Sequence, residues 1–105
     1  MAQFDVYENT NQSTRKQYPL LVDVQHSVLS TLATRIVIPL SQKDSVHGAL
    51  MDVLMPEVVL DDQPYVLMTP QISAVPDRLL STPIGTLQHC RSHVLAALDF
   101  AITGI

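Results

Sequence analysis

Arg35-Ile36-Val37-Ile38 is the stretch that decides the fold of this chain, and the other elements are predicted around it. Its residues are β-branched and nearly all apolar, which is typical of a central strand buried on both faces. Pro39 follows directly and has no amide hydrogen, so we expect the hydrogen-bond ladder to end there. The stretch therefore predicts a sheet with residues 35–38 near its centre.

Two more strands are predicted before this central one, at residues 3–7 and 18–24. In the first, polar and apolar residues alternate, so Phe4 and Val6 are expected on the buried face and Tyr7 on the opposite face. The second is a run of apolar and β-branched residues that starts at a proline, as an edge strand or a strand start does. Both are expected to join the same sheet.

Loops and turns separate the remaining segments. The polar stretch 8–17 has no apolar anchor and is predicted to be a mobile hairpin loop, and residues 41–50 form a second polar excursion. Residues 57–60 and 65–68 flank a turn of aspartate, glutamine and proline, which predicts a β-hairpin. Residues 71–75 are expected to form one more short strand.

From Leu87 onward the apolar residues recur with a period of 3.6, which predicts a helix. Thr86 is expected to cap its start and Gly104 to end it. The predicted buried stripe consists of Leu87, Cys90, Val94, Ala97, Leu98 and Ala101. The opposite face carries His89, His93, Ala96, Phe100 and Thr103. Five or six strands followed by one C-terminal helix predict an α+β fold that is mostly β, a small β-barrel with a helix.

The 105 residues fit a single domain that spans residues 1–105. Hydrophobic residues make up 47% of the chain, and the net charge is −4 with six scattered basic residues. Direct binding to nucleic acid needs clustered Lys and Arg, so a protein partner is the better match. The lone Cys90 allows no internal disulfide, and no secretory signal or membrane-spanning run is present, which favours the cytoplasm.

The helix runs directly into Ile102-Thr103-Gly104-Ile105, and this ending is expected to present a contact element. Terminal residues are poorly ordered unless something holds them, whereas here an apolar helix carries a Gly-Ile dipeptide to a fixed place. Further apolar groups are expected at the surface, at Ala96 and Phe100 and at the Val28-Leu29 pair. Such a patch marks a protein interface, either with a second copy of the chain or with another partner.

Three groupings of polar residues were weighed as chemical sites. His89 and His93 are spaced to share a metal, but further ligands are lacking, so we expect surface histidines, no metal and no cofactor. Cys90 lies on the buried stripe and is expected to act as a small hydrophobe. Asp61-Asp62 fits turn chemistry better than acid–base catalysis.

A fourth grouping is expected to be structural. Asp23 lies within a strand and Arg35 on the next, so the two are predicted to form an ion pair. The chain also lacks a glycine-rich phosphate loop and a nucleophile elbow. Nothing in the sequence indicates an enzyme.

Several ordered stretches resemble the CcdB family of plasmid and chromosomal toxins. They are Gln3-Phe4-Asp5-Val6-Tyr7, Leu21-Val22-Asp23-Val24-Gln25, Arg35-Ile36-Val37-Ile38-Pro39-Leu40, Ser73-Ala74-Val75-Pro76 and the terminal Gly104-Ile105. Their order and spacing match from residue 1 to 105. The resemblance implies a homodimer of SH3-like barrels of the CcdB/MazF kind, each with a C-terminal helix.

The resemblance also implies a function. Family members are toxins of type II toxin–antitoxin systems that bind the A subunit of DNA gyrase and trap its cleaved-DNA complex; they are topoisomerase poisons and not enzymes. A CcdA-like antitoxin wraps and neutralises the toxin, and the pair represses its own operon, so DNA is met only through the antitoxin. Such modules serve plasmid maintenance, and no membrane is involved.

Site residues carry over from the family by position. The gyrase-contacting residues correspond to Val28, Leu29, Asp99, Ile102, Thr103, Gly104 and Ile105. The antitoxin-binding loop corresponds to Glu8, Asn9, Asn11 and Arg15. Some members have a Trp before the final Gly-Ile where this chain has Thr103, and losing a stacked aromatic at a hot spot weakens binding. Phe100, one helical turn earlier, is the expected partial replacement, with Ala96 beside it as a further partner contact.

Two alternatives remain open on the sequence. The same barrel serves messenger-RNA-cleaving toxins of the MazF and Kid type, which need a basic groove and a set of groups around one phosphate. The scattered cations and the charge of −4 speak against that reading. The second alternative is a non-toxic relative that keeps only the antitoxin interaction.

Overall fold

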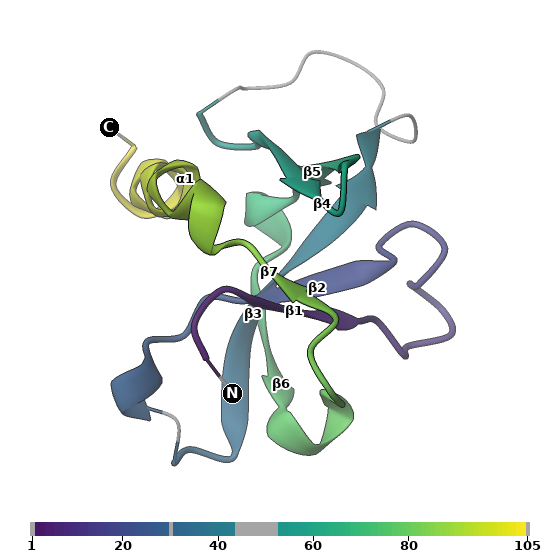
Figure 1. The fold of residues 1–105 in the computed structure, drawn as a ribbon. Coiled ribbons are helices and arrows are strands. Elements are labelled where there is room, and N and C mark those ends of the chain that lie inside the picture. The colour runs from purple at the N-terminus through teal and green to yellow at the C-terminus, as the bar shows by residue number, and fades with distance from the viewer. Residues whose placement is uncertain (1, 30, 44–52, 105) are drawn as a thin grey trace.

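The computed structural model describes residues 2–29, 31–43 and 53–104, and within them the chain forms a small, nearly closed β-barrel with one C-terminal α-helix (Figure 1). The strands are β1 (Asp5–Glu8), β2 (Leu20–Asp23), β3 (Thr34–Gln42), β4 (Glu57–Leu60), β5 (Gln63–Leu67), β6 (Ser73–Pro76) and β7 (Gly85–Thr86). The helical segments are η1 (Ser27–Leu29), η3 (Thr69–Gln71), η4 (Asp77–Leu79), η5 (Gln88–Cys90) and α1 (Arg91–Thr103). This confirms the predicted mostly-β, α+β class.

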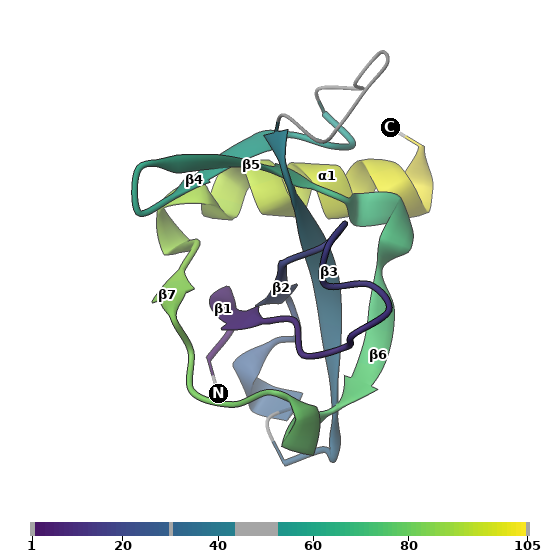
Figure 2. The same cartoon turned by 90° about the vertical axis from the view of Figure 1, so that its right-hand side faces the viewer.

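β3 is the centre of the sheet, as its apolar sequence predicts. One of its edges pairs with β2, and the other pairs first with β6 and then with β5. The whole order is β4-β5-β3-β2-β1-β7, with β6 beside the first half of β3. Figure 2 shows β3 running almost the full height of the molecule. Because β3 is long, it pairs with β6 near one end of the barrel and with β5 near the other.

Pro39 does not end this strand, contrary to the sequence-based prediction, because its missing N–H lies where no ladder bond is needed. The Pro39 carbonyl accepts a hydrogen bond from the N–H of Met68, on the edge of β3 away from β2. The proline nitrogen faces that same edge, at the point between the end of β6 and the start of the β5 pairing. The strand therefore continues to Gln42.

The main core lies between the sheet and α1. It contains Phe4, Val6, Leu20, Val22, Val24, Ile38, Leu40, Val58, Leu60, Leu67, Leu87, Val94 and Ala97. In Figure 2, α1 runs along the β4–β5 hairpin at one end of the barrel. The helix is held there because Val94 and Ala97 are fully buried.

A second, smaller core lies on the opposite face of the sheet. Tyr7 lies on the face opposite Phe4 and Val6, as predicted, and it is fully buried there with Val37 and Leu80. Leu80 follows η4, so the β6–β7 connection covers this face of the sheet. Alternation along a strand cannot reveal a cover of this kind, because the covering residues lie about 70 positions away in the chain.

The C-terminal helix begins later than its sequence predicts. Thr86 does not cap it: the Thr86 Oγ1 accepts the N–H of Gln88 at 3.2 Å, but Leu87 and Cys90 occupy the N-cap positions of η5 and α1, and neither helix has a side-chain cap bond. Gly104 ends α1 in the left-handed conformation, with φ of 75°, as predicted. Ala101, expected on the buried stripe, is exposed, and Phe100, expected on the outer face, is partly buried.

Two further predictions concern the β4–β5 hairpin and residues 41–50. β4 and β5 form the predicted hairpin, and Asp61 and Asp62 at its turn both have positive φ, of 50° and 64°, which confirms turn chemistry for this pair. The polar excursion expected at residues 41–50 falls mainly outside the described residues, although Ser41 and Gln42 complete β3.

Candidate functional site

The end of α1 presents an exposed surface. Asp99, Ile102, Thr103 and Gly104 are all exposed, and Ile102 keeps 79% of its surface accessible. The Thr103 hydroxyl donates to the carbonyl of Asp99 at 2.6 Å, so it is already used inside the helix. Ile105 lies outside the described residues. Ile102 is the most exposed of the large apolar side chains in the part of the chain that the structure describes.

Two features fix the direction in which this helix end points. Val94 and Ala97 anchor the middle of α1 in the main core. At the end, the Gly104 N–H bonds the carbonyl of Phe100 and closes the last turn in a left-handed cap. Ile102 is therefore held on a regular helix and not on a frayed tail.

The second predicted contact element, Val28-Leu29, lies in η1. Leu29 is 43% exposed; the side chain of Val28 is outside what the structure describes. Buried Gln25 ties this turn to the sheet, because its Nε2 donates to the carbonyl of Leu29 at 2.9 Å and its Oε1 accepts the N–H of Ile36 at 3.2 Å. Sequence analysis missed this role of Gln25. An amide directly after a buried strand was its only signal.

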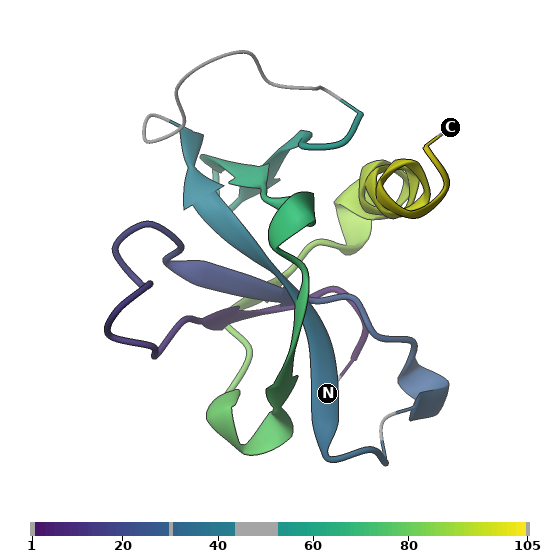
Figure 3. The ribbon, with the colours of Figure 1, turned by 180° about the vertical axis from the view of Figure 1, so that it is seen from behind.

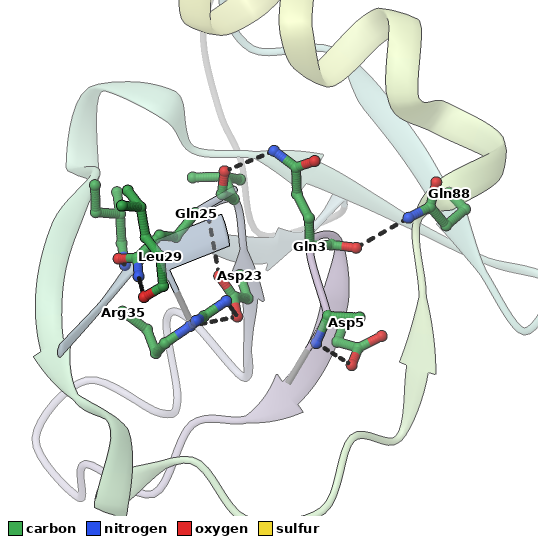
Figure 4. A network of polar contacts seen from close by, with 10 residues as sticks. Gln3, Asp5, Asp23, Gln25, Leu29, Arg35 and Gln88 are labelled. Carbon is green, nitrogen blue, oxygen red and sulfur yellow. Dashed lines mark hydrogen bonds and ion pairs between the residues drawn. The ribbon is translucent and has the colours of Figure 1, made fainter. Parts of the chain in front are cut away.

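The predicted ion pair between Asp23 and Arg35 is confirmed. The same pair also positions Gln25. Arg35 Nη2 lies 2.6 Å from Asp23 Oδ2, and its Nε donates to the same oxygen at 2.8 Å, with both side chains fully buried. The other carboxylate oxygen accepts the N–H of Gln25 at 3.0 Å. Figure 4 shows the resulting chain of contacts from Arg35 to Leu29. Burial raises the pKa of Asp23, against the hydrogen bonds from Arg35 and Gln25.

The two contact elements share one side of the sheet. In Figures 1 and 3, η1 and the end of α1 lie on the same side of β3, at opposite ends of it. Ile36 pairs with Ala74 in β6, and Ile72 directly precedes that strand. Ile36 and Ile72 are 39% and 40% exposed. This side of the sheet thus carries exposed apolar residues as well as both contact elements.

The loop between β1 and β2 (residues 9–19) contains Asn9, Asn11 and Arg15, three of the residues expected to bind an antitoxin, and the fourth, Glu8, ends β1. Asn9 organises the loop: its Nδ2 donates to Thr14 Oγ1 at 3.0 Å and to the carbonyl of Tyr18 at 2.8 Å. Asn9 and Asn11 line a groove of about 520 Å³, whereas Glu8 and Arg15 are exposed and lie outside its lining.

The remaining candidate residues, on η5 and α1, either contact the rest of the fold or lie exposed on the helix. His89 Nε2 lies 2.7 Å from the carbonyl of Val59, which ties the start of the helix to β4. His93 and Ala96 are exposed, and Cys90 is partly buried against the main core. Among the described residues, no three metal-ligating side chains cluster, and no helix is long and apolar enough to cross a membrane.

One comparison with known proteins bears on these surfaces. The model of the family described as CcdB protein matches residues 3–104. The match includes β1, the β1–β2 loop, the η1 turn and α1 up to its cap at Gly104, and it ends one residue before Ile105.

Proposed function

Because the chain belongs to the CcdB family, we propose that it binds the A subunit of DNA gyrase and traps the gyrase-cleaved DNA complex as the toxin of a type II toxin–antitoxin module. Membership supports the toxin role itself. The observation that supports the gyrase contact is Ile102, 79% exposed on a capped helix end. In this proposal the chain acts as a poison and not as an enzyme.

The contact surface has two parts in this proposal. Asp99, Ile102, Thr103, Gly104 and Ile105 supply the helix end, and Val28 with Leu29 supplies η1. Thr103 cannot replace an aromatic ring, since its hydroxyl is bonded within the helix. Phe100 offers only part of its ring, because it is partly buried. Ile102 is therefore the main apolar contact, with Ala96 at its margin.

A second copy of the chain is the proposed occupant of the apolar side of the sheet. Ile36 and Ile72 are exposed there, and twofold dimers commonly bury such faces. The homodimer would act in the cytoplasm, as a single domain per chain. The antitoxin would bind Glu8, Asn9, Asn11 and Arg15 on the β1–β2 loop and would supply the DNA contact for operon repression, since the toxin carries a net charge of −4.

The gyrase contact can be tested by measuring the affinity of the purified A subunit for the wild type and for two variants. Ile102→Ser removes the exposed apolar group from the helix end, and a loss of affinity of about tenfold or more is expected for a hot-spot contact. Ile84→Ser is the matched control, since Ile84 is 43% exposed and lies between η4 and β7. Equal affinity of all three proteins would contradict the assignment of Ile102.

A further inference from the structure

The β2–β3 ladder ends irregularly, next to the η1 turn. One step beyond the last residues that pair in register, the N–H of Val24 donates to the carbonyl of Ile36 at 2.9 Å. In a regular antiparallel pair, the Ile36 N–H would return this bond to the Val24 carbonyl. It donates instead to Oε1 of Gln25, at 3.2 Å. A side-chain amide therefore takes the place of a backbone carbonyl.

The Val24 carbonyl has a side-chain partner of its own. It accepts a hydrogen bond from Nε2 of Gln3 at 3.1 Å, and the carbonyl of Gln3 accepts one from Nε2 of Gln88 at 3.0 Å. Gln88 begins η5, which leads directly into α1. Figure 4 shows these contacts running from Gln25 across to Gln88. Three glutamine side chains thus connect the end of β2 with the base of the helix.

The other end of the Gln25 amide holds the η1 turn. Its Nε2 donates to the carbonyl of Leu29 at 2.9 Å, and the residue is only 4% exposed. A carbonyl can only accept and a backbone N–H can only donate, so the two partners fix which way the amide faces. Meeting both partners takes one donor and one acceptor at the tip of a side chain of this length. Glutamine supplies both, and methionine, which has a similar length, supplies neither.

This amide matters because burial does little to hold the turn. His26, Ser27 and Leu29 are all exposed, and segments with few buried side chains open at a low cost in free energy. The backbone of Gln25 is fixed separately, because its N–H donates to Oδ1 of Asp23 at 3.0 Å. The side chain of Gln25 therefore extends from a rigid point in the sheet to an exposed turn.

We propose that Gln25 is the positioning residue of the η1 contact turn. Gln3 supports it, because a Val24 carbonyl that is already bonded leaves the Ile36 N–H to Gln25. A contact turn that is held in place before binding loses less conformational entropy when a partner docks. That gyrase is the partner rests on the proposed function, whereas the positioning of η1 does not.

The free protein tests the positioning directly, through the ¹⁵N order parameters of Ser27 and Leu29. Gln25→Met should lower them from a rigid value near about 0.85 to below about 0.6, and Gln3→Met should lower them less. Leu80→Val is the control for lost stability. It shortens a side chain in the second core, on the opposite face of the sheet, and should leave η1 unchanged. Rigid order parameters at η1 in Gln25→Met would overturn the proposal.

The affinity of the gyrase A subunit tests what the positioning does. Gln25→Met should weaken binding about tenfold, as the loss of a whole contact element would. Adding Leu29→Ser to Gln25→Met should then weaken it by less than about twofold, because Leu29 is already out of place. Ile102→Ser should keep its full effect in the Gln25→Met background, because Val94 and Ala97 hold α1 independently. Leu80→Val should bind like the wild type.

The two measurements separate two kinds of failure. A full loss from Leu29→Ser both with and without Gln25 would overturn the positioning role, even if gyrase binds. Absence of gyrase binding by the wild type would contradict the proposed function. The order parameters of η1 would then decide the positioning role by themselves, since they are measured without any partner.

Discussion

At the scale of single residues, the buried ion pair of Asp23 and Arg35 connects the sheet to the η1 contact turn. Asp23 accepts from Arg35 with one oxygen and from the Gln25 N–H with the other, and Gln25 then holds the Leu29 carbonyl. The pairing could be predicted, because neighbouring strands carry opposite charges in an apolar setting. The role of Gln25 could not, since it depends on where the chain turns after β2.

We expect Asp23→Asn to destabilise the protein by about 3–5 kcal/mol, because it leaves the buried Arg35 charge without its partner. Urea denaturation at neutral pH measures this. Asp62→Asn is the control, since Asp62 is exposed in a turn with φ of 64°, a conformation that Asn tolerates. A loss below about 1 kcal/mol for Asp23→Asn would mean that the pair has little weight in the fold.

The raised pKa of Tyr7 predicts that the free energy of unfolding falls at alkaline pH. Burial, and then the charges of Asp5 and Asp23, raise the pKa of Tyr7 above its ordinary value of 10.0. Below pH 10 both the folded and the unfolded tyrosine keep their proton, so the free energy of unfolding is unaffected. Above it the unfolded tyrosine ionises first, and stability falls by at most about 1.4 kcal/mol per pH unit.

The variant Tyr7→Phe should remove this part of the alkaline loss. At pH 8 it should be as stable as the wild type or more stable by about 1 kcal/mol, because the buried Tyr7 hydroxyl has no hydrogen-bond partner among the described residues. Urea denaturation between pH 8 and pH 11 compares the two proteins, and Tyr18 and Tyr65 are common to both. Parallel pH curves would refute the assignment to Tyr7.

At the scale of elements, the sequence predicted β1 to β6 and the helix, but neither β7 nor every boundary. β3 continues past Pro39 because the proline faces the gap between β6 and β5. The position of this gap depends on how the strands pair and not on the residue preferences of β3. The helix starts late because residues 88–90 form the 3₁₀ segment η5 before α1 begins at Arg91. Phe100, expected on the outer face of the helix, is partly buried. The burial of Tyr7 could not be predicted, because Leu80 covers it from a distant part of the chain.

The contact between His89 and Val59 gives a test of how the helix is tied to the barrel. His89→Ala should lower the free energy of unfolding by about 0.5–1 kcal/mol, as expected for the loss of one hydrogen bond at the surface. His93→Ala, one turn further along the exposed helix surface, is its control and should change little. Equal effects of the two substitutions would show that the His89 bond does not stabilise this junction.

Gly104 tests the helix end itself. Its φ of 75° costs a side-chain-bearing residue about 1–2 kcal/mol, and Asn bears this better than Ala. We therefore expect Gly104→Ala to reduce hydrogen-exchange protection of the Gly104 amide and of the last turn, and Gly104→Asn to reduce it less. Unchanged protection in the Ala variant would mean that the left-handed cap is not needed.

At the scale of the whole molecule, the chain has two separate surfaces on opposite faces of one sheet. One carries Leu29, Ile36, Ile72 and Ile102 and has the apolar character of an interface. The other carries the groove that the β1–β2 loop, Leu21, Val37 and Val75 line. The family could be inferred from ordered sequence stretches, and the match over residues 3–104 confirms it. The groove could not, because the residues that line it come from segments far apart in sequence.

The proposed homodimer gives one prediction at this scale. The wild type should sediment as a dimer, and Ile36→Glu should shift it toward the monomer, because the charge would be buried in the interface without a partner. Val59→Glu on β4, at 42% exposure, is the matched control and should stay dimeric. A monomeric wild type at micromolar concentration would contradict the dimer.

The most direct test of the gyrase proposal is a DNA-cleavage assay with purified gyrase, ATP and supercoiled plasmid, scored for linear DNA after denaturation. The wild type is compared with Ile102→Ser and with a chain that ends at Thr103. We expect linear DNA with the wild type and little or none with either variant. Absence of linear DNA with the wild type, together with cleavage of added RNA, would contradict gyrase poisoning and assign the chain to the RNA-cleaving toxins of the same barrel.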